Sequence, residues 1–160
     1  MNMVFPVADP VTPLAAAPAI LAAANLLLPH LERGQRVDAA TLRGAMETAF
    51  GASDATGVWD WKLAYEACEV ATVLFLRKYG KALFRKAGSP VSRLDPLAKI
   101  AGLLPTQTRR SEESQSFQQF STPLPLGLAA LAAAGVTPDD VVLEPSAGTG
   151  LMAILAQAAG

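Results

Sequence analysis

The chain has 160 residues, 51% of them hydrophobic, and its 13 basic and 14 acidic side chains give a net charge of −1. The single cysteine, Cys68, excludes an internal disulfide and fits a reducing, cytoplasmic compartment. The single histidine, His30, cannot supply a metal cluster, so we expect no metal site.

Two helices are predicted in the first third of the chain. The first runs from about Pro13 or Pro18 to Leu31, before Gly34. Residues 11–28 are apolar enough to suggest a membrane span or signal peptide, but prolines interrupt them and no Lys or Arg precedes them. A core helix is therefore favoured, with no membrane contact. The second helix follows Asp38 as its N-cap and ends before Gly51.

The longest helical pattern spans residues 58–79, where aromatic and apolar side chains recur at three- and four-residue steps. Such a stripe favours a core face that includes Cys68 as a buried thiol, with base stacking as the alternative. A break is predicted at Gly88-Ser89-Pro90, and Asp95-Pro96 predicts the start of a short helix that ends near Leu104.

Positive charge is concentrated between residues 77 and 110, where nine basic residues minus Asp95 give +8. A solvated helix end explains part of this cluster. The alternative is a nucleic-acid contact, made by Arg77, Lys78, Lys81, Arg85, Lys86, Arg109 and Arg110.

We place a domain boundary near Pro105, between a helical module (1–105) and a second unit (106–160). The start of the second unit is polar, which is typical of a linker or an arm. Thr122 is then the predicted N-cap of a helix that begins with Pro123 and ends at Gly135, and residues 137–140 predict a turn.

Residues 141–143, Val-Val-Leu, predict a buried strand of a parallel sheet. Glu144 ends this strand, a small-residue loop follows from Pro145 to Gly150, and apolar residues at helical spacing predict a helix from Leu151. Strand, acid, glycine loop and helix in this order are typical of a nucleotide-type ligand site.

Three interpretations of the glycine loop remain. Residues 148–153 fit the G-x-G-x-x-A form of a dinucleotide fingerprint, although an acid and three residues separate the strand from the first glycine. A phosphate-binding P-loop is disfavoured because no lysine follows Gly150, and a simple glycine-rich turn is the third possibility. The preferred ligand is S-adenosylmethionine (SAM), because backbone N–H groups of residues 148–150 suit its carboxylate and Glu144 suits its ammonium.

The segment Phe120-Ser121-Thr122-Pro123, about twenty residues before the acid and glycine loop, resembles motif X preceding motif I in N6-adenine DNA methyltransferases. The resemblance implies a SAM site made by Gln119, Phe120, Thr122, Pro123, Glu144, Pro145, Ser146, Ala147, Gly148, Thr149 and Gly150.

From about Leu26 onward, segments such as F-G-A-S-D-A-T-G-V-W-D-W-K-L-A-Y-E-A-C-E and L-L-P-T-Q-T-R-R-S-E-E-S look like the N-terminal part of bacterial strawberry notch-like proteins. In that family a class I SAM-dependent methyltransferase domain precedes a DEAD/DEAH helicase domain. The resemblance implies DNA as a partner, contacts with downstream methyltransferase and helicase domains, and ATP and Mg only in the helicase.

The expected fold is therefore mainly α, with a helical module followed by the first α-β-α elements of a Rossmann-like methyltransferase domain. The catalytic Asn-Pro-Pro-Tyr/Phe segment of the family does not occur in these residues, so we expect an inactive fragment of a DNA adenine methyltransferase. The alternatives are a helical module that docks nucleic acid or the helicase beside a vestigial SAM site, and part of an NAD-type oxidoreductase.

Overall fold

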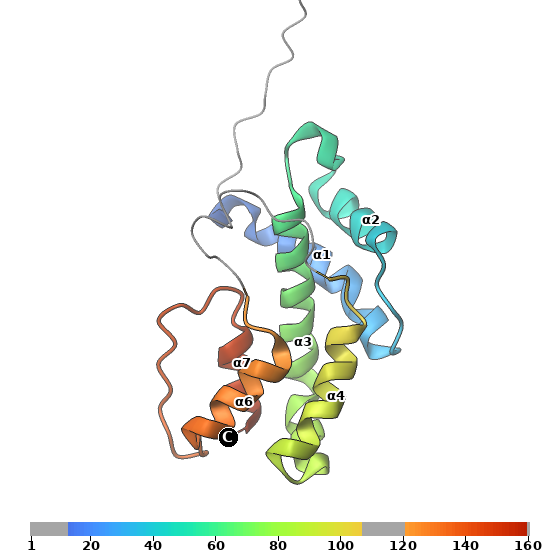
Figure 1. Cartoon of the computed structure of the whole chain (residues 1–160). Helices are drawn as coiled ribbons and strands as arrows, with labels where there is room; N and C mark the ends of the chain where they lie inside the picture. Colours follow the sequence, from blue (N-terminus) through green and yellow to red (C-terminus); the bar gives the residue numbers. More distant parts are fainter. Residues whose placement is uncertain (1–12, 107–120, 160) are drawn as a thin grey trace, which may run out of the picture.

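The computed structural model describes residues 13–106 and 121–159, and every regular element in these ranges is helical (Figure 1). The elements are α1 (Pro13–Glu32), α2 (Ala39–Phe50), the short 3-10 helix η1 (Asp54–Thr56), α3 (Trp61–Ala87), α4 (Pro90–Gly102), α6 (Leu124–Ala134) and α7 (Leu151–Ala159).

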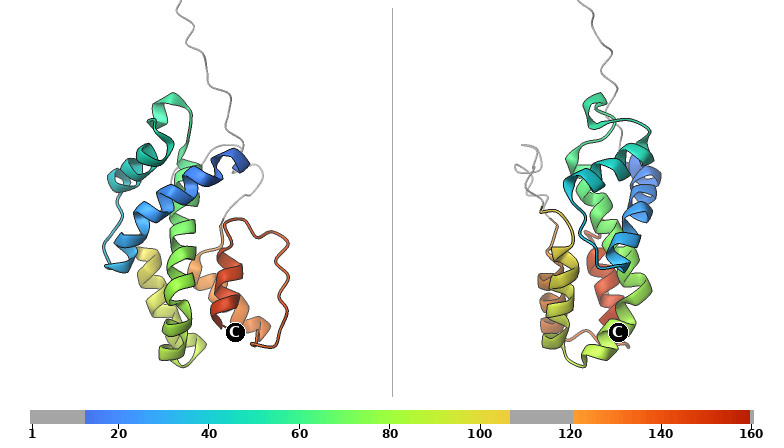
Figure 2. Two further views of the ribbon diagram at one scale, coloured as in Figure 1. Left: turned by 180° about the vertical axis from the view of Figure 1, so that it is seen from behind. Right: turned by 90° about the vertical axis from the view of Figure 1, so that its right-hand side faces the viewer.

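Helix α3 is the central helix, against which α1, α2, α4 and α7 pack, while α6 packs on α4 and α7 (Figure 2). Its first half forms one apolar core with α1 and α2, through residues such as Ala67 and Ala71. Its second half forms another core with α4, α6 and α7, through Leu76 and Phe84. The broad apolar stripe predicted for this helix is therefore buried on different sides along its length.

Helices α1 and α2 begin and end close to the predicted residues. Gly34, after α1, has a φ of 64°. Asp38 caps α2 by accepting a hydrogen bond from the Thr41 backbone N–H at 2.8 Å, and Gly51 ends the helix with a φ of 69°. Both glycines occupy the left-handed region, where residues with a Cβ are strained.

Helix α1 is the one described helix long and apolar enough to cross a membrane, over Ala15–Glu32. A helix in a protein core meets the same criteria of length and composition. Here Ala16, Ala23, Ala24 and Leu27 are almost fully buried in the core shared with α3.

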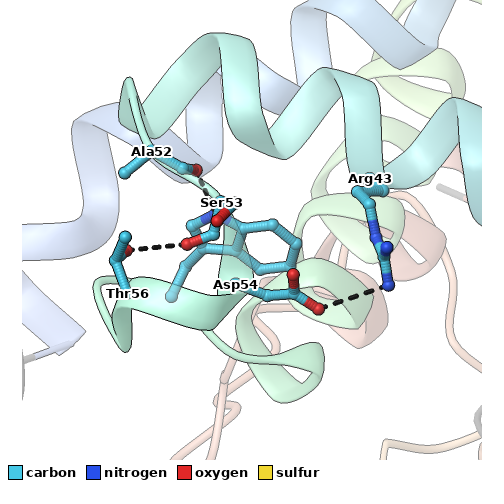
Figure 3. Close-up of polar contacts among 6 residues, drawn as sticks. Arg43, Ala52, Ser53, Asp54 and Thr56 are labelled. Carbon is cyan, nitrogen blue, oxygen red and sulfur yellow. Dashed lines mark hydrogen bonds and ion pairs between the residues drawn. The ribbon is translucent and has the colours of Figure 1, made fainter.

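The connection between α2 and α3 is held by short-range hydrogen bonds (Figure 3). Arg43 forms an ion pair with Asp54 at 3.3 Å, and the Thr56 hydroxyl donates to the Ser53 carbonyl at 2.7 Å. Trp59 is only 2% exposed, and its indole N–H donates to the Ala52 carbonyl at 2.8 Å. The large apolar ring is thus buried with its polar atom satisfied.

Helix α4 begins earlier than predicted. Its N-cap is Ser89, whose side chain and backbone exchange hydrogen bonds with those of Ser92, and Pro90 occupies its first turn. Asp95 and Pro96 lie inside this helix, so the helix start predicted there is wrong. The sequence signal was misread because Ser89-Pro90 is also a cap-and-proline pair.

Helix α6 begins one residue later than predicted, at Leu124. Its N-cap is Pro123, and no side-chain hydrogen bond caps the helix, so the capping role predicted for Thr122 is wrong. The Gly127 N–H donates to the Pro123 carbonyl at 3.0 Å, and Gly135 ends the helix with a φ of 66°, as predicted.

The predicted strand is absent, and with it the Rossmann-like part of the expected fold. No strand occurs in residues 13–106 or 121–159, so the fold class predicted as α-β-α from residue 106 onward is wrong. Val141 and Leu143 are 101% and 87% exposed instead of buried. A strand requires a neighbour that pairs with its backbone N–H and C=O groups, and the described residues provide none beside this segment. Figure 1 shows the chain between α6 and α7 arching away from the helices.

Candidate functional site

The glycine loop leads directly into α7, and its glycines have the backbone freedom that was predicted. Gly148 and Gly150 have φ values of 51° and 86°. The Gly150 N–H donates to the Ala147 carbonyl at 2.7 Å, which closes a tight turn before Leu151. The predicted helix after the loop is therefore present, although the strand before it is not.

The predicted cofactor residues are divided between two cavities that adjoin the start of α7. Thr122 and Pro123 line a cavity of about 530 Å³ among α3, α4, α6 and α7, which we call the α6 pocket. Glu144 and Gly150 line a cavity of about 730 Å³ under the arch of the loop, which we call the loop pocket. Pro145, Ser146, Ala147, Gly148 and Thr149 line neither cavity, and Gln119 and Phe120 lie outside the described residues.

The α6 pocket combines apolar walls with a few polar groups. Its lining comprises Tyr65, Cys68, Glu69, Thr72, Ala101, Leu104, Pro105, Thr106, Ser121, Thr122, Pro123, Leu124 and Leu151. A concave, largely apolar surface with few polar groups is typical of sites for small organic ligands. Residues from both predicted units therefore meet around one cavity.

One hydrogen bond connects the glycine loop to this pocket. The Thr149 hydroxyl donates to Oε2 of Glu69 at 3.0 Å, joining residues 80 positions apart in the chain. The bond is partly buried, so the glycine loop is held against α3 beside the cavity.

Burial is the main influence on the titratable groups Glu66 and Cys68 in this part of α3. Burial raises the pKa of the Glu66 carboxyl, and the charges of Glu69 and Asp60 raise it further, against the opposing charge of Lys62. Burial also raises the pKa of the Cys68 thiol to about 12, with a smaller contribution from Glu69. Cys68 is therefore a buried, protonated thiol, as its sequence context predicted, and it is a poor nucleophile.

The loop pocket has mixed charge. Arg77 and Lys81 line it from α3, while Asp140 and Glu144 line it from the loop. The Asp140 carboxylate accepts hydrogen bonds from the Thr137 N–H and hydroxyl, both at 2.8 Å, and these bonds lower its pKa. Glu144 accepts from the Ser146 N–H at 2.9 Å. Both carboxylates therefore stabilise turns within the loop.

The basic residues predicted to contact nucleic acid lie on more than one surface. Arg77 and Lys81 face the loop pocket, and Arg85 follows one turn later along α3. Lys78 instead forms an ion pair with Glu32 at 2.7 Å, and Lys86 lines a cavity beside Glu32. The hydrogen bond from Lys78 is the main cause that lowers the pKa of Glu32 and raises that of Lys78. Arg109 and Arg110 lie outside the described residues.

Sequence reasoning did not single out the polar residues that α3 brings to the α6 pocket. Glu69 was overlooked and Thr72 was assigned only to the core stripe, because the aromatic and apolar residues around them predicted a core face. A signal was nevertheless present, since Glu69 is four residues after Tyr65 and three before Thr72 and so shares their face of the helix. A carboxylate on such a face needs a polar partner.

Comparisons with known proteins do not identify a family: no family model, curated protein or solved structure matches this chain. Among residues 13–106 and 121–159, no three His, Cys, Asp or Glu side chains are grouped so that they could hold a metal ion.

Proposed function

We propose that the α6 pocket binds S-adenosylmethionine and that this chain contributes cofactor binding to a DNA methyltransferase. The observation that carries the proposal is a cavity where the residues that resemble motif X meet the helix that follows the glycine loop. Thr122 and Pro123, which resemble motif X, line the same pocket as Leu151, the first residue after the glycine loop that resembles motif I. Thr149 of that loop is hydrogen-bonded to Glu69, which also lines the pocket.

The residues present suit this ligand in size and in chemistry. A volume of about 530 Å³ falls within the range of roughly 300–1,000 Å³ that small-molecule sites occupy. Tyr65, Leu104, Leu124 and Leu151 offer apolar surface for the adenosine and the methyl group. When bound, the cofactor would supply an electrophilic methyl group on a sulfonium.

The proposal does not depend on a sheet, because the groups invoked here lie on helices or on the segments that connect them. The chain's own contribution is to hold the cofactor between α3, α6 and α7 and to shield it from water. The 160 residues contain no Asn-Pro-Pro-Tyr/Phe segment that would hold a flipped adenine, so they are assigned no role in activating the target amine.

Isothermal titration calorimetry with S-adenosylmethionine tests the proposal directly. We expect saturable binding that Thr122→Trp weakens by at least about tenfold, because Thr122 is exposed at the pocket and a large side chain there narrows it. Thr48→Trp is the matched control, since Thr48 is an exposed threonine on α2 outside the pocket lining. Binding of NADH without binding of S-adenosylmethionine would refute the proposal and favour the oxidoreductase interpretation.

A second candidate function is docking of nucleic acid through α3. The observation that favours it is the placement of two exposed cations, Arg77 and Lys81, one helical turn apart beside the loop pocket. Binding through phosphates weakens as salt rises, so log K falls as log salt increases. Each phosphate contact that is lost makes this negative slope shallower by about 0.9 for duplex DNA.

The corresponding test measures the salt dependence of duplex DNA binding by fluorescence anisotropy. Arg77→Gln with Lys81→Gln should reduce the slope by up to about two. Lys99→Gln is the control, because Lys99 pairs with Asp95 at 2.7 Å on the exposed side of α4 and should leave the slope unchanged. Equal slopes in all three proteins would reject a phosphate contact at Arg77 and Lys81.

A further inference from the structure

We propose that the loop pocket binds a sugar phosphate, with the phosphate on Arg77 and Lys81 and the sugar hydroxyls on Asp140 and Glu144. These four side chains line one cavity of about 730 Å³, which falls within the range of roughly 300–1,000 Å³ that small-molecule sites occupy. The inference goes beyond the proposed function, because it concerns a second cavity and a second class of ligand.

Arg77 and Lys81 are cations that the helix itself does not stabilise. Both lie more than one turn before α3 ends at Ala87, whereas the helix dipole acts on charges within the last turn. They are four residues apart, with Arg85 four residues further on, and like charges at this spacing repel one another. Within the part of the chain that the structure describes, neither side chain forms an ion pair or a hydrogen bond. Both charges are therefore available to an anion.

A phosphate monoester is the anion that suits this pair of cations. It carries a charge of about −1.5 to −2 at pH 7 and has three oxygens that accept strong hydrogen bonds. The planar guanidinium of Arg77 can donate two parallel bonds to two of these oxygens, while the ammonium of Lys81 meets the remaining charge. Both side chains are exposed at the cavity, so an anion reaches them without any rearrangement of the core.

The carboxylates of the loop accept hydrogen bonds and repel a second anion. Oδ2 of Asp140 accepts from the Thr137 N–H and hydroxyl, and Oε1 of Glu144 accepts from the Ser146 N–H. The second oxygen of each carboxylate has no partner among the described residues, so it can accept from a ligand hydroxyl. This wall therefore favours a neutral group rich in hydroxyls and disfavours a second phosphate.

Titration of the isotope-labelled chain with ribose 5-phosphate, followed by two-dimensional NMR, tests both the ligand and its position. We expect saturable shifts of backbone N–H signals at the loop pocket, such as those of Val142 and Gln157, and none at Thr122 or Leu124 of the α6 pocket. Ribose 5-phosphate should bind at least about threefold more tightly than inorganic phosphate, because its hydroxyls add hydrogen bonds. Ribose alone should bind more weakly than either.

Variants at the two walls separate their roles. Arg77→Gln and Lys81→Gln should each weaken ribose 5-phosphate and inorganic phosphate alike, by about tenfold, because a charge-assisted hydrogen bond is lost. Glu144→Gln keeps a carbonyl oxygen for the Ser146 N–H but removes the charge that strengthens a bond to a ligand hydroxyl. It should weaken ribose 5-phosphate by about threefold and bind inorganic phosphate at least as tightly as the wild type, since a negative charge is removed.

Two control variants lie away from the loop pocket. Lys99→Gln removes a cation that pairs with Asp95 on α4 and should keep ribose 5-phosphate affinity within about twofold of the wild type. Thr122→Trp narrows the α6 pocket and should also leave this affinity unchanged, so failure of adenosylmethionine binding and failure of sugar phosphate binding are told apart. Duplex DNA would use the same two cations but has no group that requires Glu144, so Glu144→Gln should not weaken duplex binding.

Each other outcome overturns the inference. Shifts outside the loop pocket, or unchanged affinity in Arg77→Gln and Lys81→Gln, would exclude the two cations from the site. Equal affinity for ribose 5-phosphate and inorganic phosphate would reduce the cavity to a site for any anion, and equal weakening of both ligands in Glu144→Gln would show that Glu144 only stabilises the loop. Tighter binding of phosphoethanolamine than of ribose 5-phosphate would assign the carboxylates to an ammonium instead of hydroxyls.

Discussion

Gly80 lies where α3 packs against Ala158 of α7, and replacing it with alanine tests the packing that places α7 beside both pockets. A Cβ added at Gly80 would lie 3.0 Å from the Cβ of Ala158. Non-bonded carbon atoms pack at about 3.5–4.0 Å, so the two helices must separate by several tenths of an ångström. Ala158 is 8% exposed and has no longer side chain that can rotate away.

The expected magnitude follows from two opposing terms. Alanine in place of glycine inside a helix stabilises by about 1 kcal/mol, while overpacking a well-packed core costs about 1–3 kcal/mol. Gly80→Ala should therefore destabilise by about 0–2 kcal/mol. Gly44→Ala in α2 is the matched control, because nothing lies within 4 Å of the added Cβ, and it should stabilise by about 1 kcal/mol.

Urea denaturation followed by circular dichroism measures the difference between the two variants. We expect Gly80→Ala to be about 1–3 kcal/mol less stable than Gly44→Ala, and a double-mutant cycle with Ala158→Gly should recover most of that difference. If Gly80→Ala stabilised the protein as much as Gly44→Ala, α3 and α7 would not pack as described, and the α6 pocket would lose one of its walls.

Three further predictions concern α3 and the connection before it. Trp59→Phe should destabilise by about 1–3 kcal/mol in urea denaturation, because the carbonyl of Ala52 loses the indole N–H that donates to it at 2.8 Å; an unchanged midpoint would contradict the assigned bond. Asp60→Ala removes the acceptor of the Leu63 N–H at 2.9 Å and should cost about 1 kcal/mol, with Asp60→Asn close to wild type. Glu66→Gln should raise the melting temperature at pH 7 but not at pH 4. The pKa of Glu66 is raised in the folded state, so its destabilising effect is absent below the unfolded-state pKa and develops as pH rises through the folded-state value. An equal gain at both pH values would contradict this explanation.

The helices of the first part of the chain were predictable because their ends are encoded locally. Asp38 and Gly51 each act within one turn of α2, through a side-chain oxygen or a positive φ, and need no distant partner. The start of α4 was ambiguous in the sequence, because Ser89-Pro90 and Asp95-Pro96 are both pairs of a capping residue and a proline. The helix begins at the first pair, and Pro96 is accommodated inside it.

The conformation of residues 141–143, which form no strand, was not predictable in the same way. Three apolar residues between turn signals satisfy the pattern of a buried strand, yet backbone pairing is a property of two segments. The turn before it, in which Asp140 accepts from Thr137, and the helix after it at Leu151 are both present, so the local signals on either side were correct.

The candidate site was predicted in part. Thr122, Pro123 and Thr149 were identified from their motifs, and the structure brings them to the α6 pocket or to a residue that lines it. Glu144 and Gly150 lie in the other cavity, and Glu69 had not been considered. The sequence by itself determined the ends of α1 and α2, the glycine turn before α7 and the apolar stripe of α3, because these depend on contacts within a few residues. Only the tertiary structure decided which polar groups share a cavity, because Glu69 and Thr149 are 80 positions apart and meet only when α7 packs on α3.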